Sequence, residues 1–234
     1  MQALDLYASI EEYLDFEEEM HHFYKTIGHT VLSKDPKTLI DIGCGQGEFC
    51  HIMSLNGIET FGVDLSPKQI EIAVSKGTNA KCIDIKDLKE TYDCATATFD
   101  VINYIPKNTI KKFLKDCYNL LNTQGYFIFD INSLYGFENV AQGTLNIDLE
   151  DKFIAIDANF KENILYTDMV VFDKIEKGKD SYKKESGTIE QYCYEKEELT
   201  NILIEVGFVV ENKIDFHLHS SEECDKYIYV CKKG

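Results

Sequence analysis

The order of apolar and polar positions predicts alternating strands and helices over residues 38–132. Short apolar runs predict strands, and apolar residues spaced by three and four predict helices. The expected strands are 38–43, 58–63, 80–83, 92–98 and 126–130. The expected helices are 48–55, 66–77 and 108–121. This alternation is typical of an α/β fold with a doubly wound, mostly parallel sheet covered by helices on both faces.

The two flanks of this region show other patterns. Before it, apolar spacing predicts a helix over residues 3–33. After it, residues 145–193 lack a helical period, and strands are expected at 153–156, 164–172 and 189–194, with a hairpin turn at 176–180. A helix over 196–206 and strands at 208–210 and 227–231 then return to the α/β pattern. We therefore expect an antiparallel β insert of about fifty residues within one domain.

Charge limits the classes of partner. The 234 residues include 41 acidic and 24 basic side chains, every basic one is lysine, and the formal net charge is −17. A nucleic acid or an anionic membrane would meet a repulsive average field, and the bidentate phosphate contacts of arginine are missing. We therefore expect neither as a partner.

Sequence features also indicate the compartment. There is no apolar run long enough for a transmembrane helix, and the first residues lack the basic and apolar regions of a signal peptide. The eight cysteines form no C-x-x-C pair, so we expect reduced, buried thiols, no metal site and a cytoplasmic location.

Candidate chemistry follows the first expected strand, in the stretch Asp41 to Glu48, which contains Gly43, Gly45 and Gly47. Glycines there permit a tight turn and close backbone approach to a ligand. Asp64 and Asp84 end the next two strands. Since ligands of open parallel sheets bind at the carboxyl ends of the strands, this pattern predicts a nucleoside cofactor. The alternative is a purely structural role, in which each aspartate caps a helix or turn.

The spacing favours one cofactor over another. A dinucleotide motif needs glycine at the sixth position counted from Gly43, where this chain has Glu48, and a glutamate there would repel a pyrophosphate. Asp41 precedes the first glycine by two residues and could hold a cationic amino group. A ligand with an amino acid at one end and adenosine at the other, S-adenosylmethionine (SAM), fits better than NAD.

These motifs resemble those of class I SAM-dependent methyltransferases of a small bacterial type. The stretches concerned are 39–47, 62–66, 82–85, 92–105, 125–133 and 194–208. The resemblance implies a seven-stranded Rossmann-like sheet in a single domain, 1–234, with a helical cap at 1–34 and a SAM-binding core at 38–132 and 194–234. It also implies an antiparallel lid at 138–193, which in relatives often mediates dimer contacts. Such enzymes methylate small molecules, including amino sugars and other amines.

The resemblance also implies roles for individual residues. Asp41 and the loop residues Gly43, Cys44, Gly45 and Gly47 would hold the methionine part of SAM. Asp64 would bind the ribose and Asp84 the adenine amine. Leu65 and Ile85 would flank the adenine, and Phe99 would border the sulfonium.

The acceptor side is less defined. Candidates at the carboxyl ends of strands are Asn103, Tyr104 and Asn132, and Tyr7 of the first helix is a fourth. Turn capping is the alternative for the asparagines and packing for the tyrosines. His217 and His219 share one face and could supply a base, although a solvated pair is the simpler interpretation. His21 and His22 are adjacent and diverge. Lysines 174, 177, 179, 183 and 184 surround the expected hairpin. They fit a solvated turn, with a basic lip for an acidic substrate as the alternative.

The sequence thus predicts methyl transfer from SAM to a small-molecule nitrogen or oxygen by in-line displacement. For a nitrogen acceptor a dedicated base is optional. Three alternatives stay open: a non-catalytic SAM-binding regulator, a methyltransferase acting on a macromolecule, and an NAD-dependent oxidoreductase.

Overall fold

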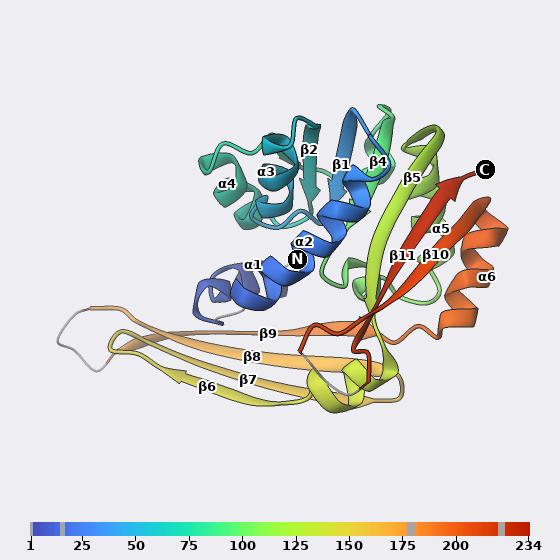
Figure 1. Ribbon diagram of the computed structural model, residues 1–234. Helices are drawn as coiled ribbons and strands as arrows, with labels where there is room; N and C mark the ends of the chain where they lie inside the picture. Colours follow the sequence, from blue (N-terminus) through green and yellow to red (C-terminus); the bar gives the residue numbers. More distant parts are fainter. Residues whose placement is uncertain (1, 15–16, 177–180, 220–222) are drawn as a thin grey trace.

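The computed structural model describes residues 2–14, 17–176, 181–219 and 223–234. A seven-stranded sheet lies at the centre of these residues, and a four-stranded sheet extends away from one end of it (Figure 1). The predicted α/β class, the mostly parallel sheet and the antiparallel insert are confirmed.

The central sheet has the strand order β10-β11-β5-β4-β1-β2-β3. Its strands are β1 (Thr38–Ile42), β2 (Glu59–Asp64), β3 (Ala80–Cys82), β4 (Tyr92–Ala97), β5 (Leu121–Asn132), β10 (Phe208–Phe216) and β11 (Lys226–Lys233). Strands β1 to β5 are parallel, and β11 runs antiparallel to both of its neighbours, β5 and β10. The carboxyl ends of β1 to β5 therefore meet at one side, which we call the carboxyl edge.

Helices cover both faces of this sheet. On one face, α5 (Ile110–Asn119) and α6 (Lys196–Val206) pack Leu114 and Leu203 into a core with Ile40. On the other, α2 (Glu17–Leu32) and α3 (Glu48–Leu55) share a core with Leu39, and α4 (Pro67–Ser75) packs beside α3. Alternate residues of β1 thus serve opposite cores, as expected of a buried strand. The predicted helix over 108–121 ends earlier because Leu121 already begins β5.

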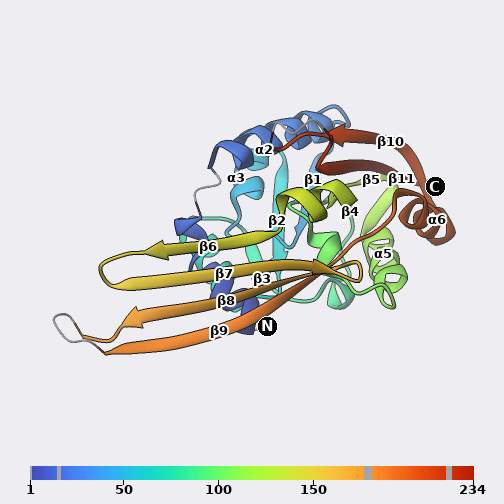
Figure 2. The same ribbon diagram turned by 90° about the horizontal axis from the view of Figure 1, so that it is seen from below.

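The insert is an antiparallel sheet of β6 (Gly143–Asp148), β7 (Lys152–Lys161), β8 (Ile164–Lys174) and β9 (Tyr182–Tyr192), in that order. Seen from below, its strands project to one side of the core (Figure 2). The sequence patterns missed β6, whose residues are nearly all exposed and so carry no alternation. Most of the hairpin turn expected at 176–180 lies outside the described residues.

The prediction of one helix over residues 3–33 is wrong. The segment forms α1 (Gln2–Ala8), the 3₁₀ turn η1 (Glu11–Tyr13) and α2. Leu6 and Ile10 pack against the insert, whereas Phe23 and Ile27 pack against the central sheet. One straight helix cannot place its apolar stripe on both surfaces, so the helix is interrupted between them. Consequently α1 and η1 bridge the insert and the core.

Three further short elements complete the described fold. They are the 3₁₀ turns η2 (Ile85–Asp87) and η3 (Val101–Tyr104) and the π-helical turn η4 (Gly136–Val140). Among the helices of the described residues, none has the length and apolar character that crossing a bilayer requires.

Candidate active site

A glycine loop joins β1 to α3 at the carboxyl edge. Gly43, Gly45 and Gly47 have φ angles of +69°, +51° and +80°, which favour glycine. A Cβ added at Gly43 would lie 2.6 Å from a methyl of Val101, whereas one added at Gly45 would meet nothing within 4 Å. Val101 therefore packs against the loop at Gly43, whereas the loop is open at Gly45, where a ligand can approach its backbone.

Asp41 lies directly beneath this loop. Its side chain is almost fully buried and accepts a hydrogen bond from the Thr96 hydroxyl at 2.7 Å. Burial raises the pKa of the Asp41 carboxyl to about 7, although the bond from Thr96 opposes this. A buried carboxylate to which the described residues give no oppositely charged partner is suited to receiving a cationic group, here the amino group of a methionine moiety.

Asp64 connects the glycine loop to α4. Its carboxylate accepts the backbone N–H of Gly45 at 3.0 Å and that of Ser66 at 2.8 Å. Burial raises the pKa of this carboxyl, and the backbone bonds lower it. Since each carboxylate oxygen has two lone pairs, Asp64 keeps acceptor capacity for two hydroxyl groups of a ribose.

The adenine side of the rim is more exposed. Asp84 follows β3, accepts the N–H of Lys86 as the cap of η2 and pairs with the Lys86 ammonium at 2.8 Å. These bonds hold the pKa of its carboxyl below the usual range despite some burial. Leu65 is exposed, whereas Ile85 is buried in the core below the edge. Asp84 thus has the structural role of capping a turn, and its contact with an adenine stays a prediction.

Cys44 turns its side chain away from the open side of the loop. It packs in a small core with Cys50 and Ile70, close to Gly62. Burial raises the pKa of its thiol. Only the backbone of Cys44 is therefore placed to meet a ligand.

The turn after β4 has an unusual backbone. Phe99 and Asp100, with φ angles of +56° and +60°, are consecutive non-glycine residues in the left-handed region. For a bulky residue such as Phe99 this conformation is strained, and strain of this kind gathers at functional sites. The Phe99 ring lies 4.5 Å from that of Phe23 and 5.2 Å from that of Tyr24, measured between centroids. The turn thus places an aromatic face between the carboxyl edge and α2.

Asn103 and Asn132 tie three elements together. The Asn103 amide donates to the carbonyl of Tyr192 in β9 at 2.9 Å, and its oxygen accepts the N–H of Asn132 at 2.9 Å. Asn103 is fully buried. These bonds give the Asn103 side chain a structural use at the carboxyl edge, and the Asn132 side-chain oxygen accepts from Lys226 at 2.8 Å. Contact of either side chain with an acceptor stays a prediction.

Tyr7 of α1 and Tyr104 of η3 lie near each other and near Asp100. Burial raises the pKa of both phenols, and the charges of Glu11 and Asp100 add to the effect. Both hydroxyls therefore stay protonated at neutral pH and are able to donate and to accept hydrogen bonds. The two tyrosines come from distant parts of the sequence, and the packing of α1 brings them together.

Some of the candidate histidines and lysines make other contacts. His219 pairs through Nδ1 with the buried Asp225 at 2.9 Å, and the His22 ring stacks on Phe216. Lys183 pairs with Glu185 at 3.0 Å on the insert, and Lys174 lies 3.9 Å from Asp151. Lysines 177 and 179 lie outside the described residues. Among the described residues, no three histidine, cysteine or acidic side chains gather as a metal site would require.

Several residues at this edge were not predicted from the sequence as part of the site. The 3₁₀ turn η1 brings Glu11 to the starts of α3 and α4, where it accepts hydrogen bonds from the amides of Gln46 at 3.1 Å and Gln69 at 2.9 Å. The Gln69 Oε1 atom is buried without a hydrogen-bond partner among the described residues. Lys226 pairs with Asp100 and Asp130. The signal available for Lys226 was a lone lysine beside the apolar run of β11.

The residues present fit SAM. Asp41 offers a buried carboxylate to the amino group, the open face of Gly45 offers backbone to the methionine part, and Asp64 offers acceptors to the ribose. The unpartnered Gln69 oxygen adds one more acceptor near Asp64 and Ser66.

Comparison with solved structures supports the same fold. A SAM-dependent methyltransferase from Clostridium acetobutylicum aligns with a TM-score of 0.76, at 23% identity, over 98% of this chain and 96% of its own. CalS10 of Micromonospora echinaspora, an amino pentose methyltransferase solved with SAM bound, aligns with a TM-score of 0.68 at 14% identity, over 92% of this chain and 91% of its own. KedS8 of Streptoalloteichus sp., a sugar N-methyltransferase, aligns with a TM-score of 0.71 at 16% identity, over 97% of this chain and 92% of its own.

Sequence comparison identifies the family. A Geobacillus sp. (strain WCH70) protein provisionally named a methyltransferase is 26% identical over 212 residues, which are 84% of this chain and 85% of the relative. A family model described as a methyltransferase domain matches residues 16–212. These findings confirm the predicted enzyme class and leave the NAD-dependent alternative without support. The chain belongs to the methyltransferase family, with the fold of its SAM-dependent class I members.

Proposed function

We propose that this methyltransferase transfers the methyl group of SAM to a nitrogen or oxygen atom of a small-molecule acceptor. The observation that carries the proposal is the cover over the carboxyl edge. Strand β9 of the insert joins the edge through Gln191, which bonds Asp100 at 2.9 Å, and through the Tyr192 carbonyl. Helix α1 packs between β9 and α4, with Ala3 against Gly187 and Asp5 bonded to Ser66. An acceptor bound beneath this cover is limited in size.

The chain's own residues would act mainly by binding and orientation. SAM supplies the activated methyl group. Asp41, the glycine loop and Asp64 would hold its two ends, and Phe99 would shield the reacting atoms from water. The Tyr7 and Tyr104 hydroxyls would orient the acceptor atom for in-line attack. A neutral amine needs no base before it attacks, since its proton leaves afterwards.

Two kinds of observation support a small acceptor. CalS10 and KedS8, which act on sugars according to their names, share this architecture nearly over their full lengths. The net charge of −17 without arginine disfavours a nucleic acid. A macromolecular acceptor and a regulator without turnover remain as outcomes of the test.

The test is release of S-adenosylhomocysteine (SAH) from SAM. Nucleotide-linked amino sugars, simple amines, phenols and carboxylic acids form one panel, and tRNA and unmodified cell protein form the other. We expect turnover with a member of the first panel and loss of turnover in Asp64→Asn. Turnover with the macromolecules alone would refute the small-acceptor proposal. Tight SAM binding with silence in both panels would favour the regulator.

We also propose that the chain forms a homodimer through the insert, which in relatives often mediates dimer contacts. Its described part exposes four large apolar side chains: Leu145, Leu149, Ile175 and Tyr182. Isolated exposed leucines need no explanation, but several on one insert favour a contact. Sedimentation of the wild type and of Leu145→Lys tests this: we expect a dimer that weakens in the variant, and a wild-type monomer at micromolar concentration would contradict it.

A further inference from the structure

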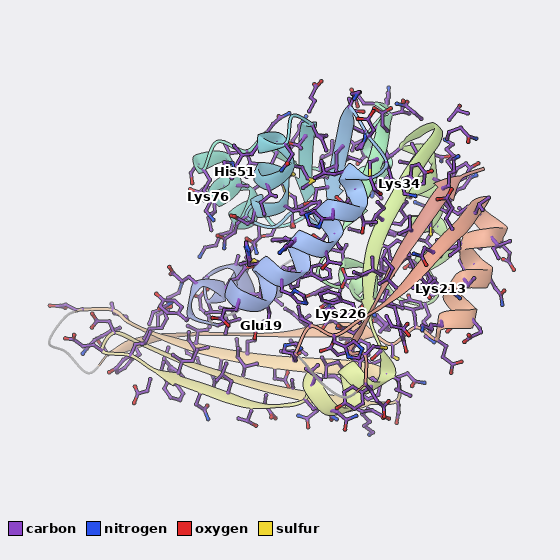
Figure 3. The ribbon with its side chains drawn as sticks, in the orientation of Figure 1. Glu19, Lys34, His51, Lys76, Lys213 and Lys226 are labelled. Atoms are coloured by element: carbon purple, nitrogen blue, oxygen red, sulfur yellow. The ribbon has the colours of Figure 1, made fainter. Side chains whose placement is uncertain are left out.

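A buried lysine holds two carboxylates at the carboxyl edge. Lys226, the first residue of β11, is 4% exposed. Its ammonium donates to Asp100, to Asp130 at 2.9 Å and to the side-chain oxygen of Asn132 at 2.8 Å. Figure 3 labels Lys226 where the central sheet meets the insert. We call Asp100, Asp130 and Lys226 the charge cluster.

The charge cluster carries an excess negative charge. Two carboxylates face one ammonium, and the other bonds that the described residues give these carboxylates come from neutral groups. These groups are the Gln191 amide, at 2.9 Å from Asp100, and the Asp100 N–H, at 3.1 Å from Asp130. Burial raises the pKa of Asp130 to about 6 while Lys226 opposes the rise, so the Asp130 carboxylate is ionised above neutral pH. The two carboxylates have hydrogen-bond donors, but the single ammonium of Lys226 does not balance both of their charges.

This charge lies beside the place expected for the cofactor. Asp100 belongs to the strained turn after β4, and the next residue, Val101, packs directly under Gly43 of the glycine loop. Strand β4 is the neighbour of β1, which carries Asp41. Among the described residues, the phenols of Tyr7, Tyr24 and Tyr104 lie near this turn and stay protonated, and the further charges that act on them are the acids Glu11, Asp41, Glu48 and Asp64. These groups are anionic or neutral, and Lys226 is the cation that the described residues place in contact with Asp100.

The two forms of the cofactor differ only near the sulfur. SAM carries a sulfonium charge and a methyl group, whereas SAH has a neutral thioether. Contacts at Asp41 and Asp64 reach parts that both forms share, so these residues bind both alike. Discrimination must come from a group that senses the charge at sulfur, and a partly buried excess carboxylate does so with little screening by water.

We propose that the charge cluster biases the site toward SAM over SAH, with Lys226 as the positioning residue that sets its net charge. The inference rests on SAM as the methyl donor but not on any acceptor. Its functional consequence is easier exchange of spent SAH for fresh SAM after each turnover.

Calorimetric dissociation constants for SAM and SAH at about pH 8 test the proposal. The quantity compared is the ratio of the SAH constant to the SAM constant. Asp130→Asn and Asp100→Asn each leave one carboxylate opposite Lys226, and each should lower this ratio about tenfold, because one negative charge near the sulfonium is lost. Lys226→Gln removes the positive charge, so the ratio should hold or rise. A purely structural network would not separate Lys226→Gln from the two carboxylate variants in this way.

The control is Asp93→Asn. Asp93 caps the opposite end of the sheet, where it accepts the N–H groups of Lys37 and Thr38 at 3.0 and 3.1 Å. This variant should lose stability and keep the wild-type ratio. Sinefungin carries an ammonium near the sulfur position. Its dissociation constant should therefore change in the same direction as that of SAM in every variant.

Thermal unfolding of each variant shows whether it is folded. Asp100→Asn and Asp130→Asn remove the same charge from different elements, so either one alone decides the question if the other fails to fold. An unchanged ratio in whichever of Asp100→Asn and Asp130→Asn is folded, or a lowered ratio in Lys226→Gln, would overturn the inference. A wild type that binds neither SAM nor SAH would instead refute the assignment of the methyl donor.

Discussion

Thr96 and Asp41 form the buried contact between β4 and β1 at the carboxyl edge, with the Thr96 hydroxyl 2.7 Å from Asp41 Oδ1. The two residues are direct neighbours in the parallel register. The hydroxyl stabilises the charged carboxylate, whereas burial destabilises it, and burial is the larger effect. The site thus holds a carboxyl that is half ionised near neutral pH, and this has measurable consequences.

The first consequence is a pH dependence of SAM binding. The ligand's ammonium favours ionised Asp41, whose carboxyl has a pKa of about 7 in the free protein. Affinity should therefore fall about fivefold to tenfold from about pH 7.5 to about pH 6, and it should fall again at high pH as the ligand's amino group, with a pKa of about 8, loses its proton. Calorimetry across this range checks it. In Asp41→Asn the acid limb should vanish together with most of the affinity, and an unchanged acid limb would assign it to another group.

The second consequence concerns stability without ligand. The folded pKa of Asp41, about 7, lies above the ordinary value of 3.8, so between these values the folded state binds more protons than the unfolded state. Asp41 therefore makes the free energy of unfolding fall as pH rises from about 4 to about 7. Urea unfolding at several pH values should show a flatter profile in Asp41→Asn. An identical slope in both proteins would contradict the raised pKa.

Thr96→Val tests the hydroxyl itself. The substitution keeps the shape but removes the hydrogen bond to Asp41, so it should cost about 1–3 kcal/mol of stability. The pH of half-maximal SAM binding should move upward, because the pKa of Asp41 loses a lowering influence. Thr98→Val, two residues further along the chain and just beyond β4, serves as control and should leave that pH unchanged.

Two glycine substitutions separate folding from binding. Gly43→Ala places a methyl against Val101 and should lose several kcal/mol of stability, from overpacking and from φ +69°. Gly45→Ala meets open space, so only the φ of +51° opposes it, at about 1–2 kcal/mol. Its methyl would occupy the ligand's side of the loop, and SAM affinity should fall at least tenfold. Affinity kept in Gly45→Ala would mean that the ligand does not approach this face.

The interrupted N-terminal helix gives a further prediction. Ile10 is fully buried against the insert, so Ile10→Ala should cost about 2–4 kcal/mol and loosen α1 from β9. Limited proteolysis and urea unfolding measure both effects. Val209→Ala, at a position that is 54% exposed, should stay within about 0.5 kcal/mol of the wild type.

Local signals predicted much of the fold and of the cofactor side of the site. Ser66 and Pro67 begin α4 and Gly207 ends α6 as their chemistry implies. Asp41 and Asp64 lie on adjacent strands at one edge because parallel pairing aligns the strand ends. Those features depend on neighbours in sequence or in strand order.

The missed features depend on contacts between distant segments. The break of the N-terminal helix is set by two different apolar surfaces, and β6 is an exposed strand that only pairing reveals. Lys226 meets Asp100 across 126 positions of sequence. A lone lysine beside an apolar run carries no local mark of its partner, so the charge cluster could not be predicted from the chain alone.

The central claim is that the carboxyl edge binds SAM through Asp64 and the glycine loop. Calorimetric titration of SAM into the wild type, Asp64→Asn and the control Asp93→Asn tests it most directly, with circular dichroism to establish folding. We predict one saturable site per chain in the wild type and in Asp93→Asn, and loss of binding in folded Asp64→Asn. Absence of saturable binding in the wild type, or equal affinity in Asp64→Asn, would contradict it.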